Sequence, residues 1–488
     1  LRLKLSASTS RFDGYYENPG NGLELGNRDT DGVGLTAVFE PSDAFQAIAR
    51  AYYVEAQRGQ PAGYNQIRTL PPTSTEVKTF TEDDFDPSRI GFSTIVKWPG
   101  SDTESLRANL EFNVGLGEAW SLRSLTGLNR NDGVVTYDFD QSPLDTPSGA
   151  PVGPNLFNCL AVGGCVGIYD YDVELEQLSE ELRLSYDGGG AFKFMVGGYY
   201  FDESYEQVEY NRFVGSSPNV GVTRANIVPR PYTQDTKAWS VFASADYRFD
   251  ERWSLNAEVR YNKEEIRGRA PNFNDLLQTG VATFVVDADA EFTNTNPRVS
   301  LNYKPAANSL YYLSVARGSK PGGVNLGQVT EAIRFFDEEE ILTYEVGAKG
   351  VYLDGRLRLT AAAYVSDYEG TQVTNVCFGS SSPFGPEANC PNSPAVSLTF
   401  IDNAEGADIK GLELELNARL TEHFSALLAY AYTDAEFNRL VTSAAGVPPA
   451  LVVNGRSDFT GNQMPLIPEN SLMLSGRYER EVASGTDG

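Results

Sequence analysis

The segment LELELNARL, residues 412–420, decides the fold class. Its apolar residues recur at every second position from Leu412, and the residues between them, from Glu413, are polar. A helix would need apolar residues at intervals of three and four, whereas a period of two is typical of a strand with one polar and one apolar face. Residues 421–423 leave room only for a tight turn, and residues 424–432 return with the same alternation. The segment therefore predicts an antiparallel β-hairpin.

The same unit recurs along the chain. Residues 239–249 and 253–262 alternate in this way around a three-residue connection, and residues 106–114 do so before another short connection. Short and long connections alternate strictly, as in outer-membrane barrels with tight turns at one rim and long loops at the other. Residues 89–98 also resemble a strand, which we assign to a long external loop because a wall strand there would place two short turns in succession. The 16 predicted wall strands are residues 1–14, 30–40, 44–56, 105–115, 119–140, 173–186, 191–213, 233–249, 253–269, 289–304, 309–320, 337–352, 356–375, 398–420, 424–438 and 471–482.

Composition agrees with a membrane barrel. The 488 residues include 26 Tyr, 26 Phe and 46 Gly, the mean hydropathy is −0.33, and no apolar run reaches the length of about 18 residues that a membrane helix needs. Low mean hydropathy is compatible with a barrel, because its strands alternate lipid-facing and lumen-facing residues. The alternative is a soluble propeller or sandwich. The hairpin spacing varies too much for a propeller, and the polar face is too charged for a dry sandwich core. We therefore predict an all-β, transmembrane, antiparallel up-and-down barrel.

The two faces of the strands should have opposite environments in such a barrel. We expect these residues to point away from the barrel axis: Val241, Ala243, Leu255, Val259, Leu412, Leu414 and Leu416. We expect these residues to point into the lumen: Arg248, Glu258, Arg260, Glu345, Lys349, Glu413, Glu415 and Arg419. An Arg or Lys on the lipid side at mid-membrane depth costs about 2–4 kcal/mol, so a whole strand cannot exchange its faces.

Charge and motif content argue against nucleic-acid binding and catalysis. The net charge is −27, whereas binding to phosphate needs a surplus of Lys and Arg. The only histidine, His423, lies in a predicted tight turn, which leaves no Ser-His-Asp triad, Cys-His dyad or HExxH zinc site. The carboxylate runs 82–84 and 338–340 could bind a metal, but solvation at loop edges is the preferred interpretation. We predict no catalytic residue, no metal site and no cofactor.

Four cysteines fall in two pairs, Cys159 with Cys165 and Cys377 with Cys390. Both pairs lie in segments rich in Gly, Pro, Ser and Asn, and neither has the CxxC spacing of a zinc or thioredoxin motif. Two loop disulfides in an oxidising compartment are the preferred interpretation, and four unpaired thiols are the alternative. The long segments that should project from the rim opposite the tight turns are residues 57–104, 141–172 and 376–397.

Four phrases resemble motifs of one protein family. Arg317–Asn325 (RGSKPGGVN) resembles the RGFKPGGFN phrase of TonB-dependent outer-membrane receptors, with Ser and Val in place of two aromatic residues. Phe335–Val373 is similar to that family's strand, turn and returning strand around "YE-G-K". Asn403–Leu416 (NAEGADIKGLELEL) and Met464–Leu472 (MPLIPENSL) resemble two later motifs in family order. Within them, we expect Gly411 to allow close approach of backbone or a neighbouring aromatic ring.

The resemblance implies a barrel of about 22 strands in the cell outer membrane, filled by an N-terminal plug. External loops and plug apices would capture an iron chelate, such as a ferric siderophore, or another small-molecule ligand. The TonB-ExbB-ExbD system would act through the N-terminal region that precedes the plug. The implied partners are therefore membrane lipid, the plug, this energising system and the ligand.

Strand arithmetic on this resemblance predicts a partial barrel. Residues 1–488 would be wall only, and the plug, the first hairpin and the last four strands would be absent. Strands 1–14 and 471–482 should then be unpaired edges of an open, curved sheet. The alternatives are a receptor of the same architecture for a carbohydrate, cobalamin or another metal chelate, a passive porin, and a non-transporting interaction barrel. Pairing of the two edge strands would favour the porin.

Overall fold

The computed structural model describes residues 1–17, 22, 24–59, 100–138, 166–210, 212–214, 229–271, 284–327, 331–377, 398–443, 452–453 and 456–480. Among them, the wall strands are β1 (Arg2–Phe12), β4 (Arg28–Ser42), β5 (Phe45–Gly59), β6 (Gly100–Leu116), β7 (Trp120–Asp138), β8 (Val166–Asp187), β9 (Phe192–Glu209), β11 (Arg230–Arg248), β12 (Trp253–Pro271), β13 (Phe284–Tyr303), β14 (Ser309–Lys320), β17 (Glu339–Tyr352), β18 (Leu357–Glu369), β21 (Gly406–Arg419), β22 (Phe424–Arg439) and β26 (Asn470–Tyr478).

Short accessory elements accompany the wall. They are β2 (Tyr16–Glu17), β3 (Glu24–Leu25), β10 (Arg212–Val214), β15 (Gly323–Val324), the 3-10 turn η4 (Glu331–Ile333), β16 (Phe335–Phe336), β19 (Gln372–Cys377), β20 (Leu398–Asn403), β23 (Val441–Ser443), β24 (Val452–Val453) and β25 (Arg456–Asp458). Within the described ranges, no helix is both long and apolar enough to span a membrane.

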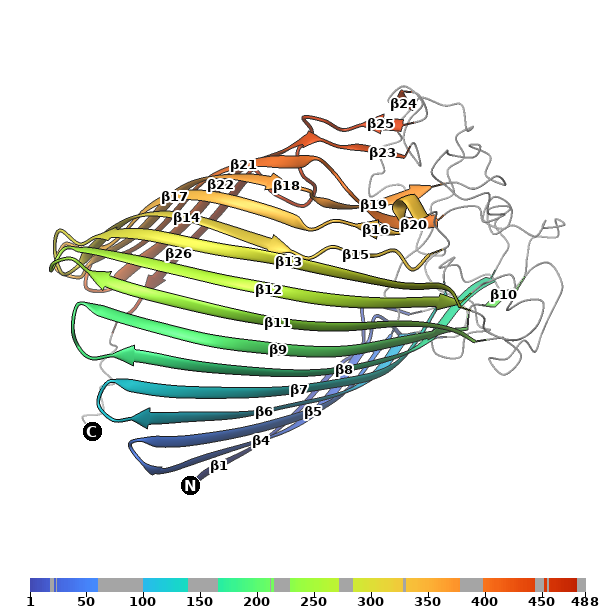
Figure 1. The fold of residues 1–488 in the computed structure, drawn as a ribbon, viewed down its shortest axis with the longest axis horizontal. Coiled ribbons are helices and arrows are strands. Elements are labelled where there is room, and N and C mark those ends of the chain that lie inside the picture. The colour runs from blue at the N-terminus through green and yellow to red at the C-terminus, as the bar shows by residue number, and fades with distance from the viewer. Residues whose placement is uncertain are drawn as a thin grey trace, which may run out of the picture.

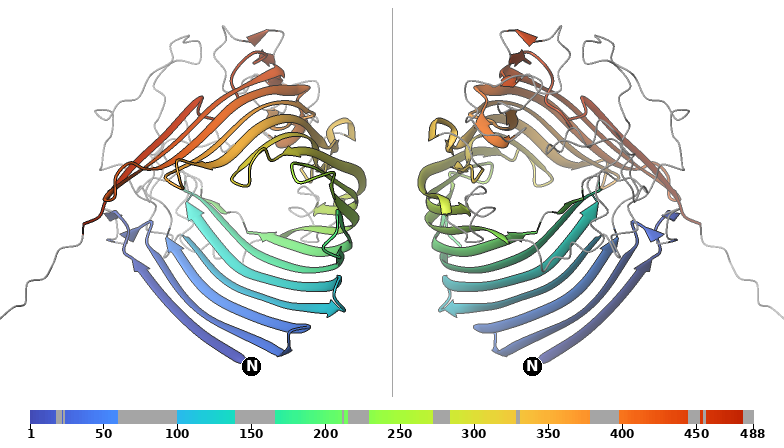
Figure 2. Two further views of the ribbon diagram at one scale, coloured as in Figure 1. Left: turned by 90° about the vertical axis from the view of Figure 1, so that its left-hand side faces the viewer. Right: turned by 90° about the vertical axis from the view of Figure 1, so that its right-hand side faces the viewer.

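The wall strands pair in chain order, each antiparallel to the next, from β1–β4 through to β22–β26. Short β10 also pairs with β8, which brings the sheet to 17 strands. The sheet curves into a deep trough (Figures 1 and 2). In the part of the chain that the structure describes, β1 pairs only with β4 and β26 only with β22. The all-β antiparallel wall is thus confirmed for these residues.

The tight connections all lie at one end of the sheet, on the left of Figure 1. They join β4 to β5, β6 to β7, β8 to β9, β11 to β12, β13 to β14, β17 to β18 and β21 to β22. The strand ends that flank the predicted long segments lie at the opposite end, which we call the loop end. The strand expected within residues 89–98 lies outside the described residues.

The turn between β11 and β12 shows why these connections can be so short. The Asp250 carboxylate accepts hydrogen bonds from the backbone N–H groups of Arg252 (2.7 Å) and Trp253 (2.8 Å). A side chain of this kind replaces the partners that the turn backbone would otherwise lack. The two N–H groups also stabilise the anion, so they hold the pKa of Asp250 below its usual range.

Acid should therefore weaken this turn. Because the folded-state pKa of Asp250 is depressed, its contribution to the free energy of unfolding is present above the unfolded pKa of about 3.9. That contribution is lost as pH falls through the folded-state pKa. We expect Asp250→Asn to lower the unfolding midpoint in urea at pH 6, and the difference from the parent protein to vanish near pH 2. Glu251→Gln in the same turn is the charge control. An equal deficit of the Asn variant at both pH values would refute this role of the carboxylate.

Aromatic residues mark two levels on the apolar side of the wall. Near the turn end, the Trp120 ring lies 5.0 Å from that of Tyr186 and 5.5 Å from that of Phe194. Nearer the loop end, the rings of Trp239 and Tyr261 are 5.6 Å apart. Aromatic rows of this kind flank the apolar band of outer-membrane barrels.

The spacing of the two levels fits a membrane. On β12, Trp253 and Tyr261 bracket the apolar residues Leu255, Ala257 and Val259. Eight residues at about 3.3 Å each, on a strand tilted by about 40°, rise about 20 Å. That height is close to the apolar band of about 25 Å in transmembrane barrels.

Two predicted wall strands extend beyond the wall into a separate ribbon. The prediction 356–375 is two strands, because the chain leaves the wall at Gly370, whose φ is 65°, before β19 begins. The prediction 398–420 is likewise β20 followed by β21. β19 and β20 pair with each other in a separate ribbon. Strict alternation of apolar and polar residues lapses at residues 366–372 and 402–408, so the sequence does signal both breaks, although the predicted strands extend across them.

A small hydrophobic cluster lies where the wall passes into this ribbon. Its buried members are Ala404, Ala407, Phe437 and Leu440, and Tyr368, Val373, Phe459 and Met464 pack against them. This cluster packs the β19–β20 ribbon against the loop end of the wall.

Candidate functional site

The strand register places the residues predicted for lumen and lipid on opposite faces. Directly paired residues of antiparallel strands share a face, and the row from Arg248 runs through Ser254, Asn302, Tyr312, Gly347 and Ala362 to Glu413. Alternation puts these predicted lumen residues on the same face, which we call the polar face: Glu258, Arg260, Glu345, Lys349, Glu415 and Arg419. The opposite, apolar face carries Val241, Ala243, Leu255, Val259, Leu412, Leu414 and Leu416.

The polar face is the more shielded one. Ser240, Ser300, Ser314 and Ser366 lie on it and are 3–8% exposed. On the apolar face, Val241 is 54% exposed and Leu313 is 58% exposed. Side chains on the inner side of a strongly curved sheet are crowded by their neighbours, so the polar face is the side that fits the interior of the trough.

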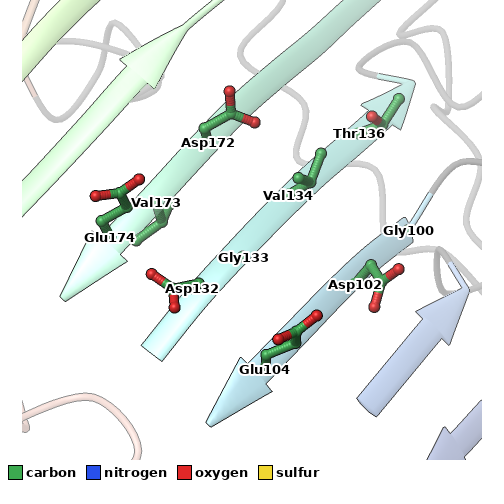
Figure 3. Close-up of a pocket in the computed structure, with 10 residues that line it drawn as sticks. All are labelled: Gly100, Asp102, Glu104, Asp132, Gly133, Val134, Thr136, Asp172, Val173 and Glu174. Atoms are coloured by element: carbon green, nitrogen blue, oxygen red, sulfur yellow. The ribbon is translucent and has the colours of Figure 1, made fainter. Parts of the chain in front are cut away.

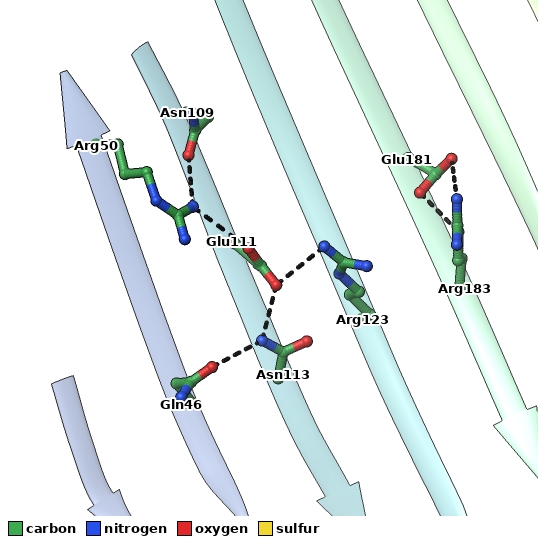
Figure 4. Close-up of polar contacts among 8 residues, drawn as sticks. All are labelled: Gln46, Arg50, Asn109, Glu111, Asn113, Arg123, Glu181 and Arg183. Carbon is green, nitrogen blue, oxygen red and sulfur yellow. Dashed lines mark hydrogen bonds and ion pairs between the residues drawn. The ribbon is translucent and has the colours of Figure 1, made fainter. Parts of the chain in front are cut away.

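Glu111 is the centre of a polar cluster across β5, β6 and β7 (Figure 4). Its carboxylate accepts a hydrogen bond from Asn113 (3.0 Å) and forms ion pairs with Arg123 (3.1 Å) and Arg50 (3.5 Å). Asn113 in turn donates to Gln46 (3.1 Å). Sequence reasoning did not select Glu111, although it is a polar member of the alternating segment 106–114. The charged side chains of this cluster are therefore linked across the strands by hydrogen bonds and ion pairs, and none of them is isolated.

A second cluster combines arginine with an aromatic ring. The guanidinium carbons of Arg183 and Arg260 lie 5.6 and 5.5 Å from the centre of the Phe242 ring. Cations in this position are attracted to the face of the ring. Each also keeps a polar partner, since Arg183 pairs with Glu181 at 2.7 Å and Arg260 donates to Asn262 at 2.7 Å. Arg260, predicted for the lumen, therefore belongs to a built cluster.

Other predicted residues are brought together through Tyr312. Its hydroxyl donates to Glu345 (2.6 Å), and the Lys349 ammonium lies 5.5 Å from the centre of its ring. Arg248 is at the turn end instead, where it donates to the backbone oxygen of Gly190 (3.2 Å). The polar face thus presents several small, internally satisfied groups along the length of the wall.

At the loop end, three side-chain amides hold separate loops together. We call Asn325, Gln372 and Asn403 the loop clamp. Asn325 follows β15, and its amide donates to the backbone oxygens of Ile333 and Ile401, both at 2.8 Å. Its oxygen accepts from the N–H of Ile401 at 2.8 Å. One buried side chain therefore uses both its donors and its acceptor.

The other two amides act at the base of the β19–β20 ribbon. Gln372 donates to the backbone oxygens of Pro321 (2.8 Å) and Asp337 (3.1 Å). Asn403 accepts from the N–H of Asp337 (2.7 Å) and donates to the oxygens of Asp337 (2.9 Å) and Gly370 (2.7 Å). Asn325 and Asn403 both belong to the phrases that resemble family motifs, and the fold brings these phrases together.

The interpretation of the acidic run 338–340 as solvated is wrong for Glu339. It was expected to be solvated, but Glu339 is 5% exposed. Its carboxylate accepts from the Tyr368 hydroxyl (2.5 Å) and from the backbone N–H of Gln372. Its neighbour Glu340 pairs with Arg317. In the described ranges, no group of three or more His, Cys, Asp or Glu residues is arranged to hold a metal ion.

Acidic side chains also gather on β6, β7 and β8 toward the loop end (Figure 3). Asp102, Glu104, Asp132, Asp172 and Glu174 line an open hollow of about 680 Å³. Glu104 and Glu174 pair across the strands with Asp132, so these three share a face. Part of the large negative charge of the chain is therefore concentrated on wall strands.

The predicted disulfides cannot be placed. Cys159, Cys165 and Cys390 lie outside the described residues. Cys377 ends β19, and its side chain is also outside the described part. Both pairings stay predictions.

Comparison with known proteins identifies one family. The family described as "TonB dependent receptor-like, beta-barrel" matches residues 42–486. A probable TonB-dependent siderophore receptor, PiuA of Acinetobacter baumannii, is 25% identical over 246 residues, which are 49% of this chain and 29% of that protein. The metal-pseudopaline receptor CntO of Pseudomonas aeruginosa is 27% identical over 247 residues, or 50% of this chain and 29% of that protein. The matched regions thus span under a third of these relatives.

Solved structures share the fold. The ferric yersiniabactin uptake receptor FyuA of Yersinia pestis superposes with a TM-score of 0.68 at 16% identity, over 99% of this chain and 62% of that one. The siderophore receptor PiuA of Acinetobacter baumannii gives a TM-score of 0.67 at 16% identity, over 98% of this chain and 65% of that one. The chain therefore spans a little under two thirds of either structure.

Proposed function

This chain belongs to the TonB-dependent receptor-like β-barrel family of the outer membrane, and we propose that it forms the wall of a receptor that takes up a ferric siderophore or a similar large, scarce nutrient. The observation that carries the proposal is the division of the wall into two faces. The apolar face, with its two aromatic levels, suits lipid. The polar face, with its satisfied charged clusters, suits a wet lumen or a packed plug. We assign the predicted lumen residues to that interior.

Two further partners are part of the proposal. A plug domain would pack against the polar face, where the clusters around Glu111 and Phe242 offer hydrogen-bond donors, acceptors and aromatic surface. The TonB-ExbB-ExbD system would act on the plug and supply the energy. The wall itself would supply a rigid surface against which the plug moves. No catalytic role is assigned to any residue.

Uptake by cells tests this function. A strain that lacks the full-length gene should be complemented by it for accumulation of radioactive iron from one of a panel of ferric siderophores: a catecholate, yersiniabactin, alcaligin and pyoverdine. Because the energy would come from the proton-motive force, a protonophore should reduce uptake to the level of the deletion strain. Uptake that resists the protonophore, or that is absent for every chelate, would contradict the proposal.

One alternative has a specific observation behind it. The relative CntO is a metal-pseudopaline receptor, so a chelate of another metal is the second candidate, and the same panel with chelates of other divalent metals distinguishes it. The passive porin required β1 and β26 to pair along their length. The described residues of these strands show no such pairing, so the porin lacks this support.

A further inference from the structure

The loop clamp joins parts of the chain that are far apart in sequence. Asn325 and Ile401 are 76 residues apart, yet they exchange two hydrogen bonds of 2.8 Å. Asn325 is 7% exposed, so water has little access to its side chain. Arg334, which is 5% exposed, donates to the backbone oxygen of Asn325 at 2.6 Å and fixes the other side of the same loop. The residues around Asn325 and Arg334 and strand β20 are thus attached at one buried point.

The ribbon is held at both of its strands. Gln372 is the first residue of β19 and Asn403 is the last residue of β20, and they are directly paired. Both donate to the backbone oxygen of Asp337, just ahead of β17. Glu339, at the start of β17, accepts from the backbone N–H of Gln372. A ribbon fixed at the base of both strands cannot hinge freely about either one.

We propose that the loop clamp is a positioning device for ligand capture: it orients the β19–β20 ribbon against residues 321–327 and 331–336. The ribbon and these residues then face the ligand as one preorganised unit. This inference rests on the proposed receptor function. Asn325, Gln372 and Asn403 are positioning residues, because their side chains are committed to backbone groups.

A single substitution at Asn325 can remove hydrogen bonds of the clamp without changing the size of the side chain. Asn325→Asp keeps size and shape, but a carboxylate has no donor for the oxygens of Ile333 and Ile401. It would also place negative charge against two carbonyl oxygens in a buried site, which is unfavourable. The matched control is Asn308→Asp. Asn308 likewise donates to a backbone oxygen, that of Val351, but lies at the turn end.

Hydrogen exchange on the full-length protein measures the clamp directly. In Asn325→Asp, amides of β19 and β20 should exchange at least about tenfold faster than in the parent protein, because local opening becomes easier. Amides of β14 and β21 should not change, and Asn308→Asp should leave the ribbon protected. Unchanged protection of the ribbon in Asn325→Asp would overturn the clamp, whether or not the protein transports anything.

Transport then tests the positioning role. For the ferric siderophore of the panel that supports uptake, Asn325→Asp should raise the half-saturating concentration and leave maximal uptake unchanged, while Asn325→Gln, which keeps the amide, should recover part of the loss. A loosened ribbon with an unchanged half-saturating concentration would overturn the positioning role. Absence of uptake for every chelate would instead count against the proposed function, and the exchange result would still decide the clamp.

Discussion

Replacing Leu414 by Arg should severely impair insertion of the full-length protein into a membrane. Leu414 lies on the apolar face of β21, where it pairs with Ala361 and Tyr430 in the middle part of the strand. An Arg facing lipid at mid-membrane depth costs about 2–4 kcal/mol, which is a large fraction of the total stability of about 5–15 kcal/mol that a folded domain has. Folding into liposomes, followed by the shift in electrophoretic mobility between folded and boiled protein, measures the effect.

The neighbouring residue provides the control. Glu415→Arg places the same side chain one position along the same strand, on the polar face. If that face lines the interior, its charge stays in water or against the plug, and insertion should be close to that of the parent protein. Equal loss of insertion for both variants would mean that the facing is wrong, and with it the whole set of predicted lumen residues.

The wall was predictable because its signal is local. A strand with one face in lipid must alternate along its own length, so β14 and β12 could be recognised without knowledge of their partners. The break at Gly370 has only a weak local signal. Alternation lapses over residues 366–372, but only the pairing of β19 with β20 distinguishes the ribbon from the wall.

The candidate site was predictable only in part. Alternation along the strands predicted that Arg260 and Glu345 lie on the same face of the sheet. It could not predict that Arg260 contacts Phe242 and that Glu345 accepts from Tyr312, because these contacts cross between strands. Glu339 was misjudged because an acidic run looks solvated in sequence. Its burial depends on Tyr368, which lies on the next strand.

The loop clamp could not be predicted from the sequence. Asn325 and Asn403 lie within phrases that resemble family motifs, but the resemblance assigns them no role. Their role is a set of contacts between loops that follow different strands. Such contacts depend on how the loops fold over the end of the wall, which no periodicity in the sequence encodes.

Close packing of Tyr364 against Gly411 gives a second strong expectation. The two residues are direct partners across β18 and β21 on the polar face. A Cβ added at Gly411 would lie 2.2 Å from the Tyr364 ring, so the expected close approach of an aromatic ring is confirmed. Gly411→Val should therefore destabilise the full-length protein by about 1–3 kcal/mol, since the ring must leave its position or the strands must separate. Unfolding by urea from liposomes measures the change.

A second substitution distinguishes a clash with the Tyr364 ring from a backbone conformation at residue 411 that does not accept Val. In Tyr364→Ala the ring is gone, so adding Gly411→Val should cost much less than it does in the parent protein, and the two changes should couple by at least about 0.5 kcal/mol. β-branched residues are good strand formers, so without the ring the valine should even favour the strand. If the valine were equally destabilising with and without the tyrosine, the glycine would be required by the backbone of β21 rather than by the ring that covers it.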